Sequence, residues 1–223
     1  MVKCKLGQSY TQLLTVTNHT LQELAFEMVA QDVVVRDGSR VFVRAGDQTQ
    51  GIAATAVFLP KDVTVLPEQS VVVSVTFTPP AETTLRAVVA MFRGSSKLST
   101  KGAVQMTASL GTLFTFTTSP DFKVQTAPIT VSAQSATSNI GVFQILTNTG
   151  TEPLVADGIV AVLDQSGVMV GKAPFESHRL LPGERMPFQA DYPSELKPGR
   201  YRVLASFQFE KQVISDSKEF TVP

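Results

Sequence analysis

The sequence predicts an all-β protein made of two tandem antiparallel β-sandwich domains. Short runs rich in Val, Thr, Phe and Ile are interrupted by Gly, Pro, Asn and Asp at intervals of about 8 to 15 residues, which is typical of antiparallel sandwiches and barrels. Helical periodicity is nearly absent. A set of strand-end and turn motifs also occurs twice in the same order, which indicates one structural unit built twice.

Length and charge limit the classes of function. The chain has 223 residues, of which 43% are apolar, and this suffices for two domains of about 100 residues each. Its 19 basic and 19 acidic residues give zero net charge. Nucleic-acid binding needs cations that neutralise phosphates, and membrane-surface binding needs polybasic segments, so we expect neither. No apolar run approaches the roughly 20 residues that span a bilayer, so no transmembrane segment is expected.

In the first half of the chain, alternating apolar runs predict eight strands. Asp37 and Gly38 between two of them predict a tight hairpin turn, because Gly and Asp adopt positive φ at the lowest cost. The predicted strands are Leu13–Thr17, Leu24–Val34, Arg40–Val43, Val63–Val65, Val71–Phe77, Leu85–Phe92, Val104–Ala108 and Leu113–Thr117.

One stretch, "TLQELAFEMVAQDV", fits two interpretations. Leu21, Leu24 and Met28 lie at helical spacing, and Thr20 with Glu23 resembles a capping box. Leu24, Phe26 and Met28 also alternate as in a strand. The neighbouring strands and the hairpin turn favour the strand.

After Pro120 a second series of strands is expected. The polar stretch "TTSPDFKVQTAP" separates it from the first series and predicts a domain boundary, with domains at residues 1–119 and 120–223. The strands are Ile129–Ser132, Gly141–Thr147, Gly158–Leu163, Val168–Val170, Met186–Tyr192, Arg200–Phe209 and Ser217–Val222.

The repeated motifs tie the two series together. Asn18 ends a strand in "LLTVTNHT", and Asn148 ends one in "FQILTNTGTEP". Each is followed by a Leu-Pro turn that leads into an apolar strand, at Leu66-Pro67-Glu68 and at Leu181-Pro182-Gly183. An Asn at a strand end can hydrogen-bond its own backbone through the turn, so we expect the same role for both asparagines.

The segments "LTVTN", "LPKDVTVLPEQSVVVSVTFTPP" and "GAVQMTASLGTLFTFT" resemble the immunoglobulin-like N-terminal domain of bacterial PapD-type periplasmic chaperones and related domains of bacterial surface proteins. The segments "ILTNTGTEPLVADGIVAVLDQSG" and "LLPGERMPF" resemble a bacterial immunoglobulin-like or fibronectin-like module. The resemblance implies two tandem immunoglobulin-like antiparallel β-sandwich domains.

The resemblance also implies partner-binding residues. In that family the strand that closes the first domain pairs with an incoming subunit, and its alternate side chains fill the subunit's groove. The matching positions are Val104, Met106, Ala108 and Leu110, with Phe114 and Phe116 continuing the alternation after Gly111. The other interpretation, which we favour, is that these side chains face the core of the sandwich, with a β-bulge at Gly111.

A basic pair is implied by the same resemblance, for binding the carboxylate at the end of the subunit. By position, Lys3 or Lys5 is the first member and Lys123 the second. The surrounding "SPDFKV" departs from the family's pattern at the second lysine, which lacks the expected aromatic residue and proline after it.

Residues for catalysis or metal binding are sparse. His19 and His178 each lack a second ligand at metal spacing, and Cys4 has no partner for a disulfide. Asp32, Asp37 and Asp47 surround one hairpin but do not follow a calcium-loop pattern. The sequence predicts no enzyme activity, no metal and no cofactor.

These observations favour a non-enzymatic protein of the bacterial cell envelope. Its partner would be another protein, a pilin-like subunit or a surface protein, bound through a sheet edge or the interdomain cleft, as in pilus-assembly chaperones. The alternative is a tandem structural or adhesive module of a surface assembly. The chain opens on a strand-like stretch, so we expect a periplasmic or other extracytoplasmic protein whose signal peptide has been removed.

Overall fold

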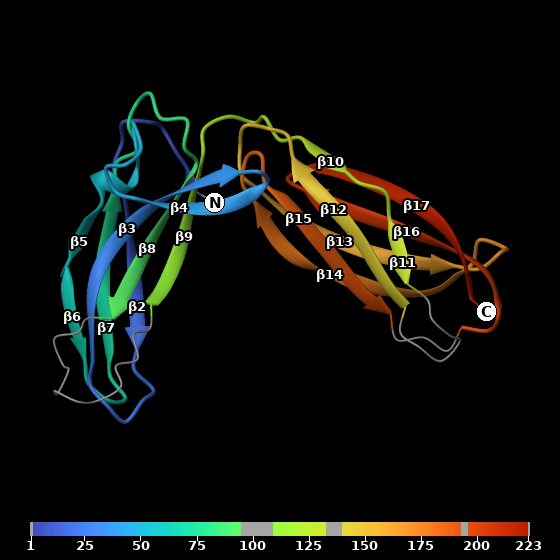
Figure 1. Cartoon of the computed structure of the whole chain (residues 1–223), viewed down its shortest axis with the longest axis horizontal. Coiled ribbons are helices and arrows are strands. Elements are labelled where there is room, and N and C mark those ends of the chain that lie inside the picture. Colours follow the sequence, from blue (N-terminus) through green and yellow to red (C-terminus); the bar gives the residue numbers. More distant parts are fainter. Residues whose placement is uncertain (1, 95–108, 133–139, 193–195, 223) are drawn as a thin grey trace. The chain divides into compact units, whose positions relative to one another are not determined.

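The computed structural model describes residues 2–94, 109–132, 140–192 and 196–222. Within these ranges the chain forms seventeen strands and one short 3₁₀ helix, without any α-helix (Figure 1). It divides into two compact units, one of Met1–Val34 with Arg40–Ser119 and one of Val35–Ser39 with Pro120–Pro223. The protein is therefore all-β, as the sequence predicts.

The first unit contains two sheets. One has the order β1-β9-β8-β3-β4, with β6 also paired to β3, and the other has the order β2-β7-β5. The strands of the first sheet are β1 (Val2–Lys3), β3 (Leu24–Arg36), β4 (Ser39–Arg44), β6 (Asp62–Val65), β8 (Ala87–Gly94) and β9 (Ser109–Thr117). Those of the second sheet are β2 (Tyr10–Thr17), β5 (Val57–Leu59) and β7 (Ser70–Phe77), and the 3₁₀ helix η1 spans Ala53–Thr55.

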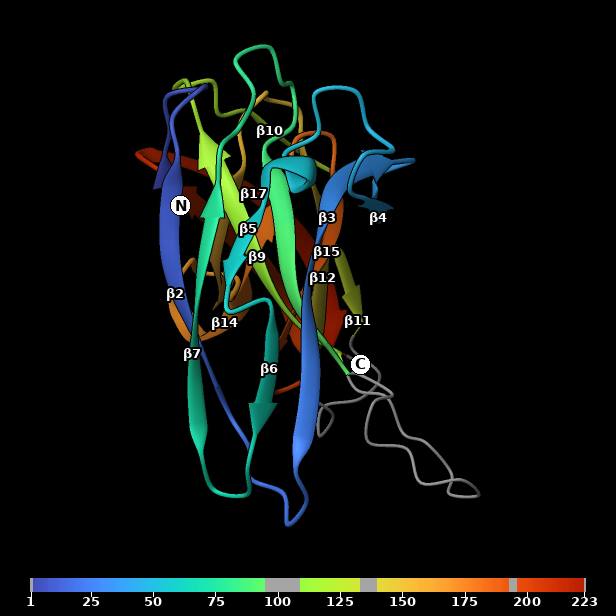
Figure 2. The same cartoon turned by 90° about the vertical axis from the view of Figure 1, so that its left-hand side faces the viewer.

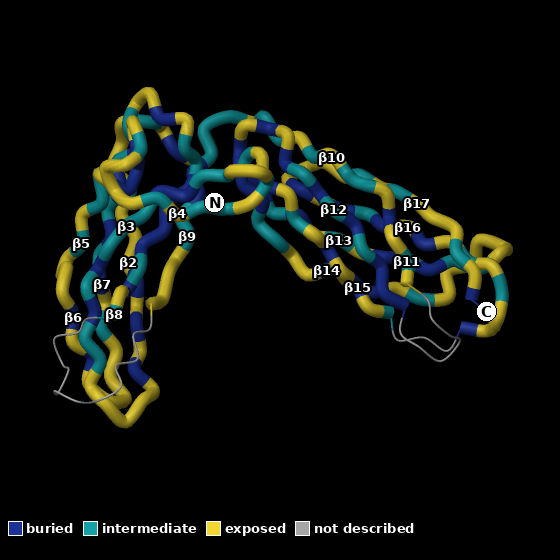
Figure 3. The backbone as a smooth tube through the Cα atoms, viewed as in Figure 1, coloured by how far each residue is buried: buried dark blue, intermediate teal, exposed yellow. Residues whose placement is uncertain are grey.

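Residues from both sheets of the first unit share one core. Val73, Val75 and Phe77 of β7 alternate with half-buried residues and pack with Met28 of β3 and Phe116 of β9. Figure 3 shows buried positions alternating with less buried ones along the strands. The arrangement is a β-sandwich, and the alternation of apolar residues in the sequence correctly predicts which side chains face its interior.

Between β5 and β6 the chain changes sheets (Figure 2). Val57–Leu59 pairs with β7, whereas Leu24, Ala25, Phe26 and Glu27 of β3 pair with β6. The Leu59–Pro60 bond between β5 and β6 is cis. The switch connects the two layers along one side of the sandwich.

The second unit also contains two sheets, with the orders β10-β12-β11, where β15 also pairs with β12, and β14-β13-β16-β17. Its core holds Phe188 of β15, Val160 of β13 and Phe207 of β16, so both sheets contribute. The strands are β10 (Val124–Thr126), β11 (Thr130–Ser132), β12 (Ile140–Asn148), β13 (Leu154–Leu163), β14 (Met169–Leu180), β15 (Arg185–Tyr192), β16 (Gly199–Phe209) and β17 (Gln212–Val222).

Three local predictions are decided by the structure. The helical alternative for "TLQELAFEMVAQDV" is wrong, because β3 begins at Leu24 and its side chains alternate. The bulge at Gly111 is also wrong: β8 and β9 pair without a register shift from Arg93 and Ser109 to Ala87 and Thr115. The hairpin turn is confirmed, since Asp37 and Gly38 have φ of 51° and 77°.

Several strands differ in extent from the prediction, and β14 differs most. The strand expected at Val168–Val170 begins at Met169 and continues to Leu180, as β14. Gly171 and Pro174 lie inside it and hid the alternation of buried Ala173 and Phe175. The strand expected at Val104–Ala108 lies outside the described residues.

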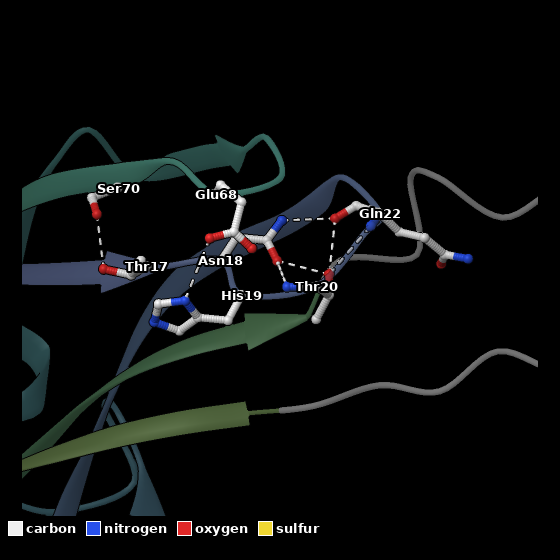
Figure 4. A network of polar contacts seen from close by, with 7 residues as sticks. All are labelled: Thr17, Asn18, His19, Thr20, Gln22, Glu68 and Ser70. Atoms are coloured by element: carbon white, nitrogen blue, oxygen red, sulfur yellow. Dashed lines mark hydrogen bonds and ion pairs between the residues drawn. The ribbon is translucent and has the colours of Figure 1, made fainter.

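Asn18 and its neighbours form a compact hydrogen-bonded cluster, which we call the Asn18 clamp (Figure 4). The side-chain amide of Asn18 is buried and donates to the carbonyl oxygens of Gln22 (2.7 Å) and Val65 (2.9 Å). Its Oδ1 accepts from the backbone N–H of Thr20 at 2.9 Å. The backbone oxygen of Asn18 accepts from Glu68 N–H at 2.8 Å, so the Leu-Pro turn is tied to the same residue.

The equivalent cluster in the second unit, the Asn148 clamp, repeats this pattern bond for bond. Nδ2 of Asn148 donates to the carbonyl oxygens of Glu152 (2.8 Å) and Leu180 (3.2 Å), and Oδ1 accepts from Gly150 N–H (3.0 Å). Its backbone oxygen accepts from Gly183 N–H at 2.9 Å. Both asparagines therefore fasten their own turn to a second, distant one.

Candidate functional site

The outer edge of β9 contains the described part of the segment that, from the sequence, is expected to bind a partner. The two-residue strand β1 pairs in parallel with β9 only at Phe116 and Thr117. Cys4 N–H extends this pairing by donating to Thr117 O at 2.9 Å. From Ser109 to Thr115, no described strand pairs with this edge. We call residues Ser109–Thr115 the β9 edge.

One hydrogen bond shows which way the backbone N–H and C=O groups of the β9 edge point. Phe116 N–H donates to Arg86 O at 2.9 Å, on the side of β8. In an antiparallel ladder alternate residues point their N–H and C=O groups to opposite sides. Gly111, Leu113 and Thr115 therefore direct both groups away from β8, toward the open edge.

Side chains of β9 are divided between the core and the surface. Phe114 and Phe116 pack against Phe77, with ring centroids 5.1 and 6.4 Å apart. Leu110 lies opposite the buried Phe92 but is itself 53% exposed. The core interpretation holds for the two phenylalanines, whereas Leu110 presents an apolar side chain to solvent. Val104, Met106 and Ala108 lie outside the described residues.

Gly111 allows close packing on the outer face of β9. A Cβ atom at this position would lie 3.1 Å from Cγ2 of Val89 and 3.4 Å from Cγ of Met91. The glycine is thus explained by contact with β8 in a regular ladder.

Lys5 lies in the turn that follows β1. Its backbone N–H donates to the Tyr10 hydroxyl oxygen at 2.6 Å, and the Tyr10 ring packs near Phe116 with centroids 6.2 Å apart. The Lys5 side chain is exposed, and it pairs with no carboxylate among the described residues. Tyr10 was not among the candidates from sequence, since the predicted strand began only at Leu13.

Lys123 belongs to the second unit and is engaged there. Its Nζ lies 2.8 Å from Oδ1 of Asp121. Oδ2 of Asp121 accepts from the hydroxyl and the backbone N–H of Thr151, at 3.1 and 3.2 Å. The hydrogen bond from Lys123, followed by that from Thr151, holds the pKa of Asp121 below its usual value. Asp121 therefore fastens the segment before β10 to the turn after β12, and the Lys123 side chain supports it through the ion pair.

Asp32 is a fully buried carboxylate of β3. Its Oδ1 accepts from the backbone N–H groups of Ile52 and Ala53, both at 2.8 Å, and so anchors the start of η1. Oδ2 has no hydrogen-bond partner and faces Gly51. Burial raises the pKa of this carboxyl above its usual value, although the two N–H groups oppose the shift.

Histidine and cysteine positions add no reactive cluster. His19 lies 3.8 Å from Glu68 in an exposed pair, and His178 packs edge-on against Phe188. Cys4 is buried. Within the described ranges no three His, Cys, Asp or Glu residues converge as metal ligands. The described part of the chain also has no helix of the length and hydropathy required to span a membrane.

No protein-family model and no curated protein matches the sequence. Among solved structures, the chain is similar to the class 5 fimbriae chaperone CfaA, with 11% identity, a TM-score of 0.42, and coverage of 100% of this chain and 95% of that one. It is similar to the Pseudomonas aeruginosa CupB2 chaperone, at 10% identity, TM-score 0.42 and coverages of 96% and 93%.

A third similar structure is the CsuC–CsuE chaperone–tip adhesion subunit pre-assembly complex from archaic chaperone-usher Csu pili of Acinetobacter baumannii. The identity is 10%, the TM-score 0.42, and the coverages 92% of this chain and 90% of that one. With scores this low, the assignment of the fold rests on the strand order and pairing described above.

Proposed function

We propose that this chain is a non-enzymatic protein of the bacterial cell envelope that binds a pilin-like subunit through the β9 edge, in the manner of a pilus-assembly chaperone. The observation that carries the proposal is the outward direction of the main-chain groups of Gly111, Leu113 and Thr115, where no described strand pairs. An open row of such groups is a template for an added strand.

Strand addition explains how the edge would combine affinity with selectivity. Main-chain hydrogen bonds supply affinity for any extended segment, whereas alternate side chains select the groove they enter. Leu110, half-exposed on this strand, is the described side chain best placed to enter a partner's groove. Val104, Met106 and Ala108 continue its alternation in the sequence and share this proposed role.

Lys5 and Lys123 are the proposed binding groups for the partner's terminal carboxylate. The side chain of Lys5 is exposed, and its backbone N–H is held by the Tyr10 hydroxyl. Lys123 would have to exchange Asp121 for the incoming carboxylate, because the two already form an ion pair. Lys123→Ala would therefore break the ion pair with Asp121 as well as the contact with the partner, whereas Lys5→Ala is expected to weaken capture through the contact with the partner.

The test is coexpression with a candidate pilin-like subunit, followed by copurification and a polymerisation assay. Leu110→Asp is expected to abolish copurification, because it places a charge in an apolar groove. Leu21→Asp is the matched control, since Leu21 is 95% exposed and lies outside β9. Equal capture by both variants would refute the role of the β9 edge.

A second arm separates the chaperone from a structural module of a surface assembly. A chaperone forms a soluble complex with the subunit and prevents its polymerisation, and Lys5→Ala weakens that complex. A structural module leaves polymerisation unchanged with or without the substitution. The second outcome would replace the proposal with the alternative.

A further inference from the structure

The second unit has a long edge strand of its own. All eleven residues of β17, Gln212–Val222, pair with β16 in one unbroken register. β17 is also the last strand in the order β14-β13-β16-β17, so no described strand pairs with its other side. Long regular edges of this kind are normally shortened, bulged or covered, because they can pair with other chains.

The hairpin turn decides which groups face that open side. Phe209 and Gln212 are opposite each other across a turn of two residues, and Glu210 in the turn has φ of 50°. The pair that closes such a turn is hydrogen-bonded, and hydrogen-bonded pairs then recur at every second residue. The main-chain groups of Val213, Ser215, Ser217, Glu219 and Thr221 therefore point away from β16.

The sequence of β17 is complementary to itself when read in the reverse direction. Ser217 is its central residue, so an antiparallel second copy centred there pairs all eleven positions. Asp216 then faces Lys218 of the other copy, twice by symmetry. Ile214 faces Phe220 in the same way, and each already packs against the core of its own unit. Opposite charges and apolar pairs at facing positions both stabilise paired strands.

Neighbouring registers lack this complementarity. If the second copy is shifted by one residue, main-chain groups that point toward the partner face groups that point toward β16. The smallest shift that again brings partner-facing residues opposite each other is two residues. A two-residue shift one way places Asp216 opposite Asp216, and the other way places Lys218 opposite Lys218. Like charges at facing positions oppose pairing, so one register is selected.

Asp216 remains able to accept a partner's ammonium group. Its Oδ2 accepts from the Thr126 hydroxyl and from Nε2 of Gln144, both at 2.6 Å, which fixes the carboxylate beside the edge. Its Oδ1 accepts no hydrogen bond from the described residues. Lys218 is exposed.

We propose that two copies of this chain associate through β17, antiparallel and centred on Ser217, so that two four-stranded sheets become one of eight strands. This contact uses the second unit and does not depend on the β9 edge. Strand pairing of this kind buries a small area, so the dimer is expected to be weak and to form at micromolar concentrations.

Disulfide trapping tests the register directly. In a Cys4→Ser background, Ser217→Cys places two thiols opposite each other at about 5.5 Å between Cα atoms, within reach of a disulfide. Ser215→Cys is the matched control: each thiol then faces Glu219, and the two thiols are roughly 13 Å apart along the strands. Oxidised dimers are expected for the Ser217→Cys variant alone. Equal trapping of both variants, or of neither, would overturn the proposal.

Sedimentation of the full chain tests the charges independently. Lys218→Asp places two carboxylates opposite each other and is expected to weaken dimerisation at least about tenfold. Lys211→Asp makes the same change of net charge in the hairpin turn, beyond the paired segment, and should leave dimerisation unchanged. A chain that stays monomeric at all concentrations, or an edge that binds only a different protein, contradicts pairing between copies.

Discussion

The two asparagine clamps have the same backbone geometry in different surroundings. In both, the amide donates to the carbonyl four residues ahead and to the carbonyl that precedes the Leu-Pro turn. Around Asn18 the turn residue Glu68 is exposed and pairs with His19, whereas around Asn148 the turn ends in Glu184, which is 3% exposed and accepts from Leu181 N–H at 2.8 Å. The asparagine and its contacts with the backbone are thus the repeated element, and the residues beside them have diverged.

Removing the amide should have the largest effect in the second unit. Asn148→Ala removes the amide donor from the buried carbonyls of Glu152 and Leu180, and Gly150 N–H keeps only its longer bond to Lys123 O at 3.2 Å. We therefore expect a loss of about 3 kcal/mol in the free energy of unfolding. Urea unfolding measures it. Thr149→Ala is the control, because Thr149 is exposed and contributes a backbone N–H that alanine retains. A loss equal to that of the control would mean that the clamp does not stabilise the unit.

Asn18→Ala should cost less, about 2 kcal/mol, although it breaks the equivalent bonds to the backbone and one more, from the exposed Thr20 hydroxyl at 2.7 Å. Thr20 and Gln22 are exposed, so water can replace the amide at these two groups, while Val65 O remains buried inside the clamp. Hydrogen exchange of Thr20 and Gly150 amides in the two variants would rank the clamps independently. A larger loss for Asn18→Ala would reverse the comparison.

Glu184, buried beside the Asn148 clamp, should contribute to the free energy of unfolding, whereas its exposed counterpart Gln69 beside the Asn18 clamp should not. Glu184→Ala removes the acceptor for Leu181 N–H and is expected to cost about 2 kcal/mol. Gln69 occupies the equivalent place after Glu68 and is exposed, so Gln69→Ala should change stability by less than about 0.5 kcal/mol. Thermal unfolding of both variants provides the check, and equal losses would mean that the two clamps had not diverged at this position.

Exchanging the turn residues should produce small effects of opposite sign. Glu68 has φ of 58° and Gly183 has φ of 78°, in the left-handed region that favours glycine. Glu68→Gly is expected to stabilise by roughly 0.5 kcal/mol and Gly183→Ala to destabilise by about 1 kcal/mol. Urea midpoints measure both. Matching signs would show that the two turns are not equivalent.

The weakest contact should be the exposed pair of His19 and Glu68. His19→Ala is expected to change stability by less than about 0.5 kcal/mol, since pairs in solvent contribute little. Measuring this variant at low and high salt also shows how much of the Glu68→Gly effect comes from charge. A salt-dependent loss above that limit would contradict the prediction.

Local features of the clamps could be predicted from sequence, and distant ones could not. The expected bond from each asparagine to its own turn is confirmed at Thr20 and Gly150. The bonds to Val65 and Leu180 were missed, because they join residues 47 and 32 positions apart and depend on how strands from the two sheets meet. The repeated Leu-Pro turns were the only sequence signal that these segments belong together.

The same limit applies to the candidate site. Alternation predicted which side chains of β9 share a face, but it did not separate the exposed Leu110 from Phe114 and Phe116, which pack against the core. Lys123 was assigned by its place in the chain, although Asp121, its ion-pair partner, stands only two residues away. Whether an edge is open is a property of the whole sheet, which alternation within one strand does not record.

The pairing of β2 with β7 has a consequence for how the protein is made. Tyr10 pairs with Phe77 and Thr17 with Ser70, whereas the hairpin of β16 and β17 closes between Phe209 and Gln212. Distant pairings form slowly, because the intervening chain must be ordered first. During synthesis the apolar face of β2 stays uncovered until β7 has been made. Each unit can form a local hairpin early, between β3 and β4 in the first and between β16 and β17 in the second. β2 is therefore the strand of the first unit that needs protection from aggregation until β7 has been made.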